Sequence, residues 1–141
     1  MTWLVYAAIT ALLLAMADFF VKLASGKLSN SLALLIFGSC TVIISLSWFV
    51  WERWQGVPQF AQTSGVVAAV LVGVTFTFVT LGVYATYGAG APLSLASPLI
   101  RLSGLLLVSL AGIAWLGEPL TWRYAFGLLL ACGGLYLIVT R

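Results

Sequence analysis

The sequence predicts an all-α integral membrane protein with five transmembrane helices, and three observations support this prediction. The chain has 141 residues, of which 63% are hydrophobic and only 6% are charged. Its mean hydropathy of +1.18 leaves too little polar surface to cover a water-soluble globule. The apolar residues also fall into five runs that are long enough to cross a bilayer, since a helix needs about 20 residues to span the hydrocarbon core.

The five runs account for nearly the whole chain. We predict crossings at residues 3–24, 32–51, 65–87, 92–116 and 122–140. The segments between them contain residues that break helices, namely "SGKLSN", "ERWQGVPQFAQTS", "GAGAP" and "GEPLT". The first run lacks a basic n-region and an A-x-A cleavage site, so we expect it to be retained rather than removed as a signal peptide. We therefore expect a single transmembrane domain over residues 1–141.

An odd number of crossings places the two ends of the chain on opposite faces of the membrane. We call the face of the N-terminus side A and the face of the C-terminus side B. The basic residues divide almost evenly, with Arg53 and Arg123 on side A and Lys22, Lys27 and Arg141 on or near side B. Because basic loops favour the cytoplasm, this balance permits insertion in both orientations, with a weak preference for side B inside.

The tryptophan residues are much less evenly distributed. All of them fall at helix ends on side A: Trp3, Trp48, Trp51, Trp54, Trp115 and Trp122. Aromatic belts normally occur at both membrane interfaces. An inverted second copy of the chain would supply the missing belt, although Tyr84, Tyr87 and Tyr136 can also serve side B.

Polar and small residues form stripes on three of the predicted helices, because residues three and four apart share a helix face. The stripes are Gly38, Thr41, Ser45 and Trp48 in the second run, Gly73, Thr77, Thr80, Tyr84 and Tyr87 in the third, and Ser94, Ser97, Arg101 and Gly104 in the fourth. Small and hydroxylated residues often only allow helices to pack closely. The alternative is a polar cavity between the helices.

Arg101 favours the cavity. A cation near the bilayer centre costs about 3 kcal/mol on insertion scales, so such residues usually face a bundle interior or water. The competing explanation is that the side chain reaches the interface, but about nine residues, or about 13 Å of helix, separate Arg101 from the start of its run. We therefore interpret Arg101 as a cavity residue.

Three further charged residues lie in or beside the crossings. Asp18 and Lys22 are one helical turn apart near the end of the first run, where they can neutralise each other or change partner or protonation state during a functional cycle. Glu118 lies in the turn before the last run. With Thr121 as N-cap, we expect Glu118 to be a structural turn residue that supports the start of that helix through its free amides and dipole.

Composition also argues against several classes of function. The chain has no His and three acidic residues in total, so we expect no constellation of nucleophile, base or metal ligands such as an enzyme acting on lipids would need. Cys40 and Cys132 lie inside predicted crossings, where we interpret them as apolar fillers. There is no basic cluster for nucleic acid. We expect no catalytic residues, no metal and no cofactor.

The last two runs carry a resemblance to a known family. The stretch "SPLIRLSGLLLVSLAGIAWLGEPLTWRYAFGLLLACGGLYLIV" resembles the fourth and fifth helices of EamA-type domains of the drug/metabolite transporter superfamily, through Pro98, Gly117, Glu118, Gly127 and Gly133. The end of the first run, "ADFFVKLAS", resembles the opening helix of the family, with Lys22 as its lysine. Most members carry two inverted five-helix repeats, whereas this chain is similar to the branch with a single repeat.

The resemblance implies one half of an inverted-repeat transporter, which binds its substrate between the two halves near the bilayer midplane. We expect a secondary transporter of a small organic metabolite or drug-like solute that works by alternating access as an antiparallel homodimer in the plasma (inner) membrane of a prokaryote. The candidate substrate-binding residues are Arg101, Tyr84, Tyr87, Thr77, Thr80 and Ser97, and the candidate coupling or gating residues are Asp18 and Lys22.

Two charges from paired Arg101 side chains favour a solute that bears a carboxylate or phosphate. Two alternatives stay open. One is a flippase for a lipid-linked sugar, and the other is an accessory or structural subunit of another membrane complex.

Overall fold

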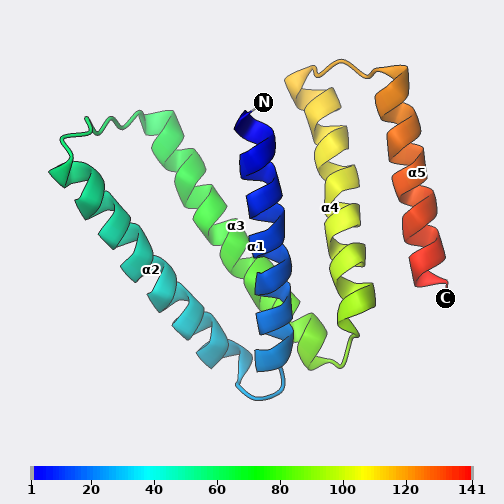
Figure 1. Cartoon of the computed structure of the whole chain (residues 1–141), viewed down its shortest axis with the longest axis horizontal. Helices are drawn as coiled ribbons and strands as arrows, with labels where there is room; N and C mark the ends of the chain where they lie inside the picture. The colour runs from blue at the N-terminus through cyan, green and yellow to red at the C-terminus, as the bar shows by residue number, and fades with distance from the viewer. Residues whose placement is uncertain (1, 141) are drawn as a thin grey trace. The chain divides into compact units, whose positions relative to one another are not determined.

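The computed structural model describes residues 2–140 and contains five α-helices (Figure 1). These are α1 (Thr2–Ala24), α2 (Asn30–Trp54), α3 (Thr63–Gly88), α4 (Leu93–Leu116) and α5 (Trp122–Val139). All five are long and apolar enough to cross a membrane, which confirms the predicted crossings. The largest difference is in α2, which begins two residues earlier and ends three residues later than residues 32–51. It begins there because the Ser29 hydroxyl accepts a hydrogen bond from the amide of Leu32 at 3.3 Å and so caps the helix.

The helices turn their apolar side chains outward. In the most apolar 18-residue window of each helix, at most 11% of the residues are buried within the protein. Trp115 and Trp122 are each 85% exposed, and long stretches of Leu, Val, Ile and Phe are also at the surface. Apolar surface on this scale requires a lipid solvent rather than water. The chain therefore has the architecture of a multi-pass membrane protein.

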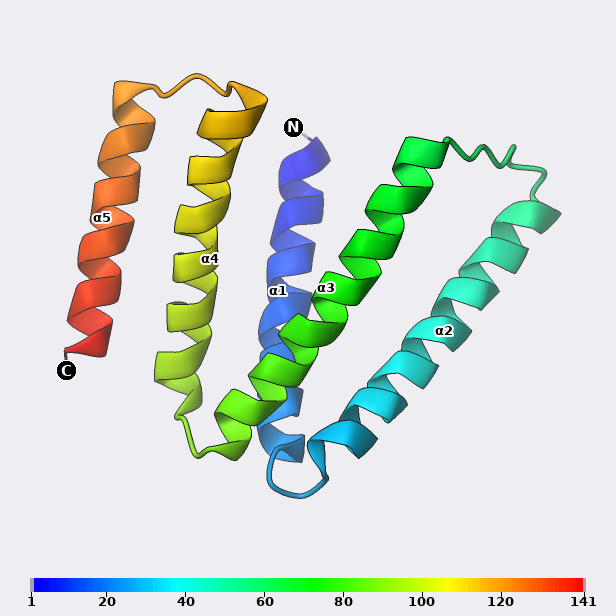
Figure 2. The same ribbon diagram turned by 180° about the vertical axis from the view of Figure 1, so that it is seen from behind.

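The helices divide into two compact units within the described residues. Helices α1, α2 and α3 form the three-helix unit, and α4 and α5 form the two-helix unit. In the three-helix unit, α3 contacts both α1 and α2. In the two-helix unit, α4 and α5 lie side by side and antiparallel, as both ribbon views show (Figure 2).

Short turns of defined geometry end the helices. Between α1 and α2, Gly26 has a φ of +80°, a backbone conformation that favours glycine, and the amide of Lys27 donates to the carbonyl oxygen of Ala24 at 3.0 Å. Within α4, Pro98 lies in the second turn and lacks the amide proton that an intrahelical bond needs. The helix continues through it to Leu116. The Gly26 turn therefore ends α1, whereas Pro98 does not interrupt α4.

Candidate functional site

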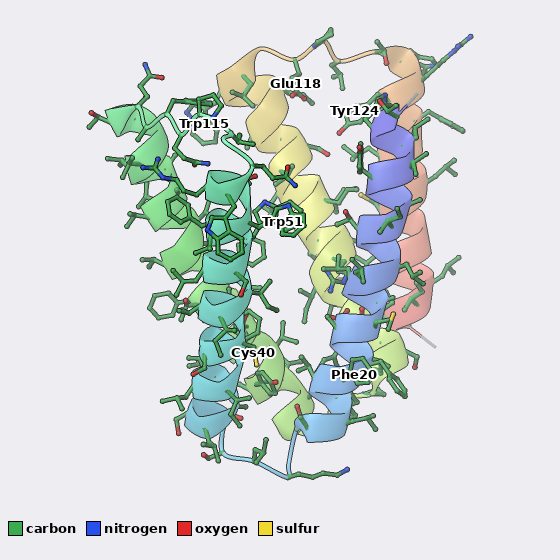
Figure 3. All side chains as sticks on the ribbon, turned by 60° about the vertical axis from the view of Figure 1, so that its left-hand side comes forward. Phe20, Cys40, Trp51, Trp115, Glu118 and Tyr124 are labelled. Atoms are coloured by element: carbon green, nitrogen blue, oxygen red, sulfur yellow. The ribbon has the colours of Figure 1, made fainter. Side chains whose placement is uncertain are left out.

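The first feature of the candidate site is the buried acid of α1. Asp18 is 8% exposed, and it is the only buried residue among those of α1 that the structure describes. Phe20, two positions further along the helix, is 58% exposed and projects outward (Figure 3). Because a carboxylate in lipid is costly, this arrangement directs the acid to the protein and the aromatic ring to the membrane.

Lys22 connects α1 to α3. Its Nζ atom lies 5.6 Å from the centroid of the Tyr87 ring, which is a cation–π distance. Tyr87 is 2% exposed, so the ring lies in the interior of the structure. Asp18 and Lys22 are separated by four residues and share a face of α1. We call Asp18, Lys22 and Tyr87 the charged cluster, which is at the side-B end of the three-helix unit.

The polar stripe of α3 leads toward this cluster. Along it, exposure falls from Thr77, which is exposed, through Thr80 and Tyr84, which are half-buried, to Tyr87. The hydroxyls of Thr77 and Thr80 donate to the carbonyl oxygens of Gly73 and Phe76, each at 2.8 Å. These bonds occupy the hydroxyl protons but leave each oxygen able to accept a hydrogen bond. The stripe therefore offers acceptors to a solute that carries donors.

The remaining predicted substrate residues belong to α4. Ser97 is half-buried, and Arg101 is exposed and one turn further along the helix. Arg101 is therefore an exposed residue of α4 rather than a buried one. The predicted residues are thus divided between the units: Asp18, Lys22, Thr77, Thr80, Tyr84 and Tyr87 in the three-helix unit, and Ser97 and Arg101 in the two-helix unit.

Glu118 differs from the expectation. Thr121 is the N-cap of α5, as predicted, and its hydroxyl accepts from the amide of Tyr124 at 3.3 Å. The Glu118 carboxylate makes no hydrogen bond to these amides, because it folds back against Gly112 of α4. Instead, the backbone amide of Glu118 donates to the carbonyl oxygen of Gly112 at 3.2 Å. Glu118 is therefore a turn residue that supports the end of α4 rather than the start of α5.

The sequence reasoning missed the polar contact between α4 and α5. The Tyr124 hydroxyl donates to the Ser109 hydroxyl at 2.5 Å, and Ser109 is 7% exposed. A signal was available, since a short turn between antiparallel helices brings residues on either side of it together. Tyr124 and Ser109 fix α5 to α4 near side A.

The α2–α3 connection carries a second polar group on side A. The Glu52 carboxylate accepts hydrogen bonds from Trp48 Nε1 at 2.9 Å and from Gln59 Nε2 at 3.2 Å. Trp48 belongs to α2 and Gln59 to the loop, so Glu52 ties the loop to the helix. These two hydrogen bonds give the Glu52 carboxylate a structural role.

The described residues, 2–140, contain no group of three His, Cys, Asp or Glu side chains that could hold a metal ion. Cys40 and Cys132 are both free thiols on the exposed surface of their helices. The arrangement can bind or move charge through the charged cluster, and it can offer acceptors along α3. In comparisons with known proteins, no family model, curated protein or solved structure matches the chain.

Proposed function

We propose that the chain is a secondary transporter of a small organic anion that also carries hydrogen-bond donors. The observation that carries the proposal is the charged cluster, in which a buried acid and a lysine occupy a membrane-spanning helix. Intramembrane charges are expensive, and they mark solute or ion pathways in membrane proteins. A purely structural helix would pack with apolar residues at these positions.

Lys22 can couple anion binding to the conformational change that alternating access requires. Its contact with the Tyr87 ring joins α1 to α3, and a cation–π contact of this kind contributes about 0.5–2 kcal/mol. A solute carboxylate or phosphate competes for the same ammonium with a stronger, charge-assisted hydrogen bond. Binding of the anion therefore weakens the α1–α3 contact. When the Lys22 ammonium returns to the Tyr87 ring, the Asp18 carboxylate on the same face of α1 repels the anion and favours its release.

The acceptors along α3 specify the remainder of the solute. The Thr77 and Thr80 oxygens can accept from hydroxyl, amine or amide groups, because their own protons are bonded within the helix. Arg101 supplies a second cation, and its planar guanidinium pairs with carboxylate or phosphate in a bidentate manner. We propose that the solute has an anionic head and a hydroxylated or amidated body.

The proposal includes a second, inverted copy of the chain in an antiparallel homodimer. Arg101 is exposed on a single chain, and a second copy would turn that surface into the interior of a shared cavity. The near-even basic residues and the one-sided tryptophans fit two opposed orientations. The resemblance to EamA-type domains supports the same assembly, in the inner membrane of a prokaryote.

Purified protein in liposomes tests the proposal directly. Vesicles are loaded with buffer and exposed to radiolabelled solutes in matched pairs, such as a hydroxylated carboxylate and its methyl ester. We expect flux of the acid and none of the ester, and we expect the acid to raise the melting temperature of the protein in detergent. Lys22→Gln should lose both effects, whereas Lys27→Gln, in the exposed α1–α2 turn, should keep them. Equal flux of acid and ester, or no flux of any solute by protein that remains folded, would contradict the proposal and favour an accessory subunit.

A further inference from the structure

The α4–α5 turn places a carboxylate against the backbone of α4. Gly117 has a φ of +66°, and both its amide and that of Glu118 donate to the carbonyl oxygen of Gly112. This turn directs the Glu118 side chain back over the helix. A Cβ atom at position 112 would lie 2.7 Å from Oε2 of Glu118, closer than Cβ contacts in proteins, so the end of the Glu118 side chain would have to move. The absence of a side chain at Gly112 therefore creates the space that the carboxylate occupies.

The exposed Glu118 carboxylate lines a pocket whose wall is mostly apolar, with polar groups from Glu118, Thr121 and Tyr124. The pocket has a volume of about 230 Å³ and is lined by Ile113, Glu118, Pro119, Thr121 and Tyr124. Figure 3 labels Glu118 on the turn and Tyr124 on α5. The hydrogen bond from the Tyr124 hydroxyl to Ser109 fixes the tyrosine ring in place. The pocket is thus built by the turn, the end of α4 and the first turn of α5.

The charge in this pocket is not neutralised within residues 2–140. The Glu118 carboxylate forms no hydrogen bond or ion pair with any of them, although Arg123 is only five positions away. Glu52, the other glutamate on side A, accepts two hydrogen bonds. Glu52 thus has donors within the protein, whereas the exposed Glu118 carboxylate is accessible to water or to an external ligand.

The surroundings of Glu118 favour a cation that can donate hydrogen bonds. The last carbonyl groups of α4 lack intrahelical partners and carry partial negative charge. Thr121 adds a hydroxyl oxygen that accepts a hydrogen bond from the backbone amide of Tyr124, and its second lone pair can accept another. The start of α5 has the opposite partial charge, but the Thr121 hydroxyl already caps the amide of Tyr124. With one aromatic ring in the wall, the pocket is not an aromatic cage and suits a primary ammonium better than a methylated one.

We propose that the α4–α5 pocket binds the primary ammonium group of an organic amine. Trp115 and Trp122 flank the turn and are each 85% exposed, which places the pocket at the level of the lipid headgroups. The same ammonium chemistry is available there from a phosphatidylethanolamine headgroup or from a soluble amine. This inference does not rest on transport, because it concerns a different unit from the charged cluster.

Native mass spectrometry of the full chain, purified in detergent, tests the pocket with lipid probes. Phosphatidylethanolamine, phosphatidylcholine and phosphatidylglycerol are added separately at equal concentration. We expect preferential binding of phosphatidylethanolamine to wild type and about tenfold weaker binding to Glu118→Gln, since a hydrogen bond to a charged group is lost. Glu52→Gln is the matched control and should bind as wild type does. Equal binding of phosphatidylethanolamine by Glu118→Gln and wild type, or equal binding of the ethanolamine and choline lipids by wild type, would overturn the lipid assignment.

A second arm separates the two sources of the ammonium. Delipidated protein is titrated with ethanolamine hydrochloride, with tetramethylammonium chloride as the control for ionic strength, and its melting temperature is measured. The pocket is assigned to a soluble amine if three results agree. Ethanolamine but not tetramethylammonium raises the melting temperature, Glu118→Gln abolishes this rise, and the lipid arm shows no preference for phosphatidylethanolamine. No response in either arm overturns the proposal. Gly112→Ala keeps the Glu118 carboxylate but displaces it. If ammonium binding depends on the position of this carboxylate, Gly112→Ala should reduce binding to the same extent as Glu118→Gln.

Discussion

The two units differ in the burial of the charged residues that belong to their candidate sites. In the three-helix unit, Asp18 is 8% exposed and Tyr87 is 2% exposed beneath the Lys22 ammonium. In the two-helix unit, Arg101 and Glu118 are both exposed. Three helices can enclose an interior, whereas a pair of antiparallel helices buries only the faces that contact each other, as at Ser109. The difference is therefore one of exposure: Arg101 and Glu118 are accessible from outside the two-helix unit, whereas Asp18 and Tyr87 are not.

The largest expected effect concerns the partner of the two-helix unit, and it is all-or-none. If a second, inverted copy covers Arg101, single cysteines at Lys27→Cys and Arg53→Cys should both react with an impermeant maleimide outside intact cells. Both are placed in a Cys40→Ala, Cys132→Ala background, which should remain unlabelled itself. Reaction at only one position would show a fixed orientation, and a parallel or heteromeric assembly would replace the antiparallel dimer.

The charged cluster gives the next largest effect. We expect Lys22→Gln to lower stability, because it removes the cation one helical turn from the buried Asp18 and a buried charge left without its partner costs about 3 kcal/mol. The double variant with Asp18→Asn and Lys22→Gln removes both charges and should recover most of the melting temperature, but not solute flux. Lys27→Gln should change neither. Full stability in Lys22→Gln alone would show that the two charges are not coupled through the fold.

Alanine substitutions at two glycines of α4 test whether Glu118 needs the space beside Gly112. Alanine is favoured over glycine in a helix by about 1 kcal/mol, and a Cβ at Gly104 meets nothing within 4 Å. Gly104→Ala should therefore raise the melting temperature. Gly112→Ala should lower it or leave it unchanged, because the new methyl group displaces the Glu118 carboxylate. Equal stabilisation by both substitutions would mean that the carboxylate does not need its place against Gly112.

Glu52 gives the smallest effect. Glu52→Gln keeps an amide oxygen that can accept from Trp48 or Gln59, so we expect less than about 1 kcal/mol of lost stability for this exposed group. The shift is read by chemical denaturation in detergent, with Trp48 fluorescence as the local probe. A loss several times larger would show that Glu52 holds more of the α2–α3 connection than its two donors.

The sequence predicts the helices well because crossing a bilayer requires a long apolar run, and such runs are visible without any tertiary contact. It also predicts the Thr121 cap, since capping depends on residue type at one position. The contact between Lys22 and Tyr87 depends on how α1 packs against α3, which periodicity does not specify. The place of Glu118 depends on the left-handed conformation of Gly117 and the open backbone at Gly112. Both features depend on the three-dimensional conformation of the turn, which the sequence pattern does not specify.

Arg101 decides the central claim that two copies of this chain form an anion-transporting cavity. Flux of an organic anion into liposomes is measured for wild type, Arg101→Lys and Arg101→Ala, beside monodispersity and melting temperature of each variant in detergent. Lysine keeps the charge but loses the planar fork, so flux should fall from wild type to Arg101→Lys and fall at least about tenfold in Arg101→Ala, with assembly and stability unchanged. Normal flux in Arg101→Ala, or a loss of folding that precedes the loss of flux, would contradict the claim.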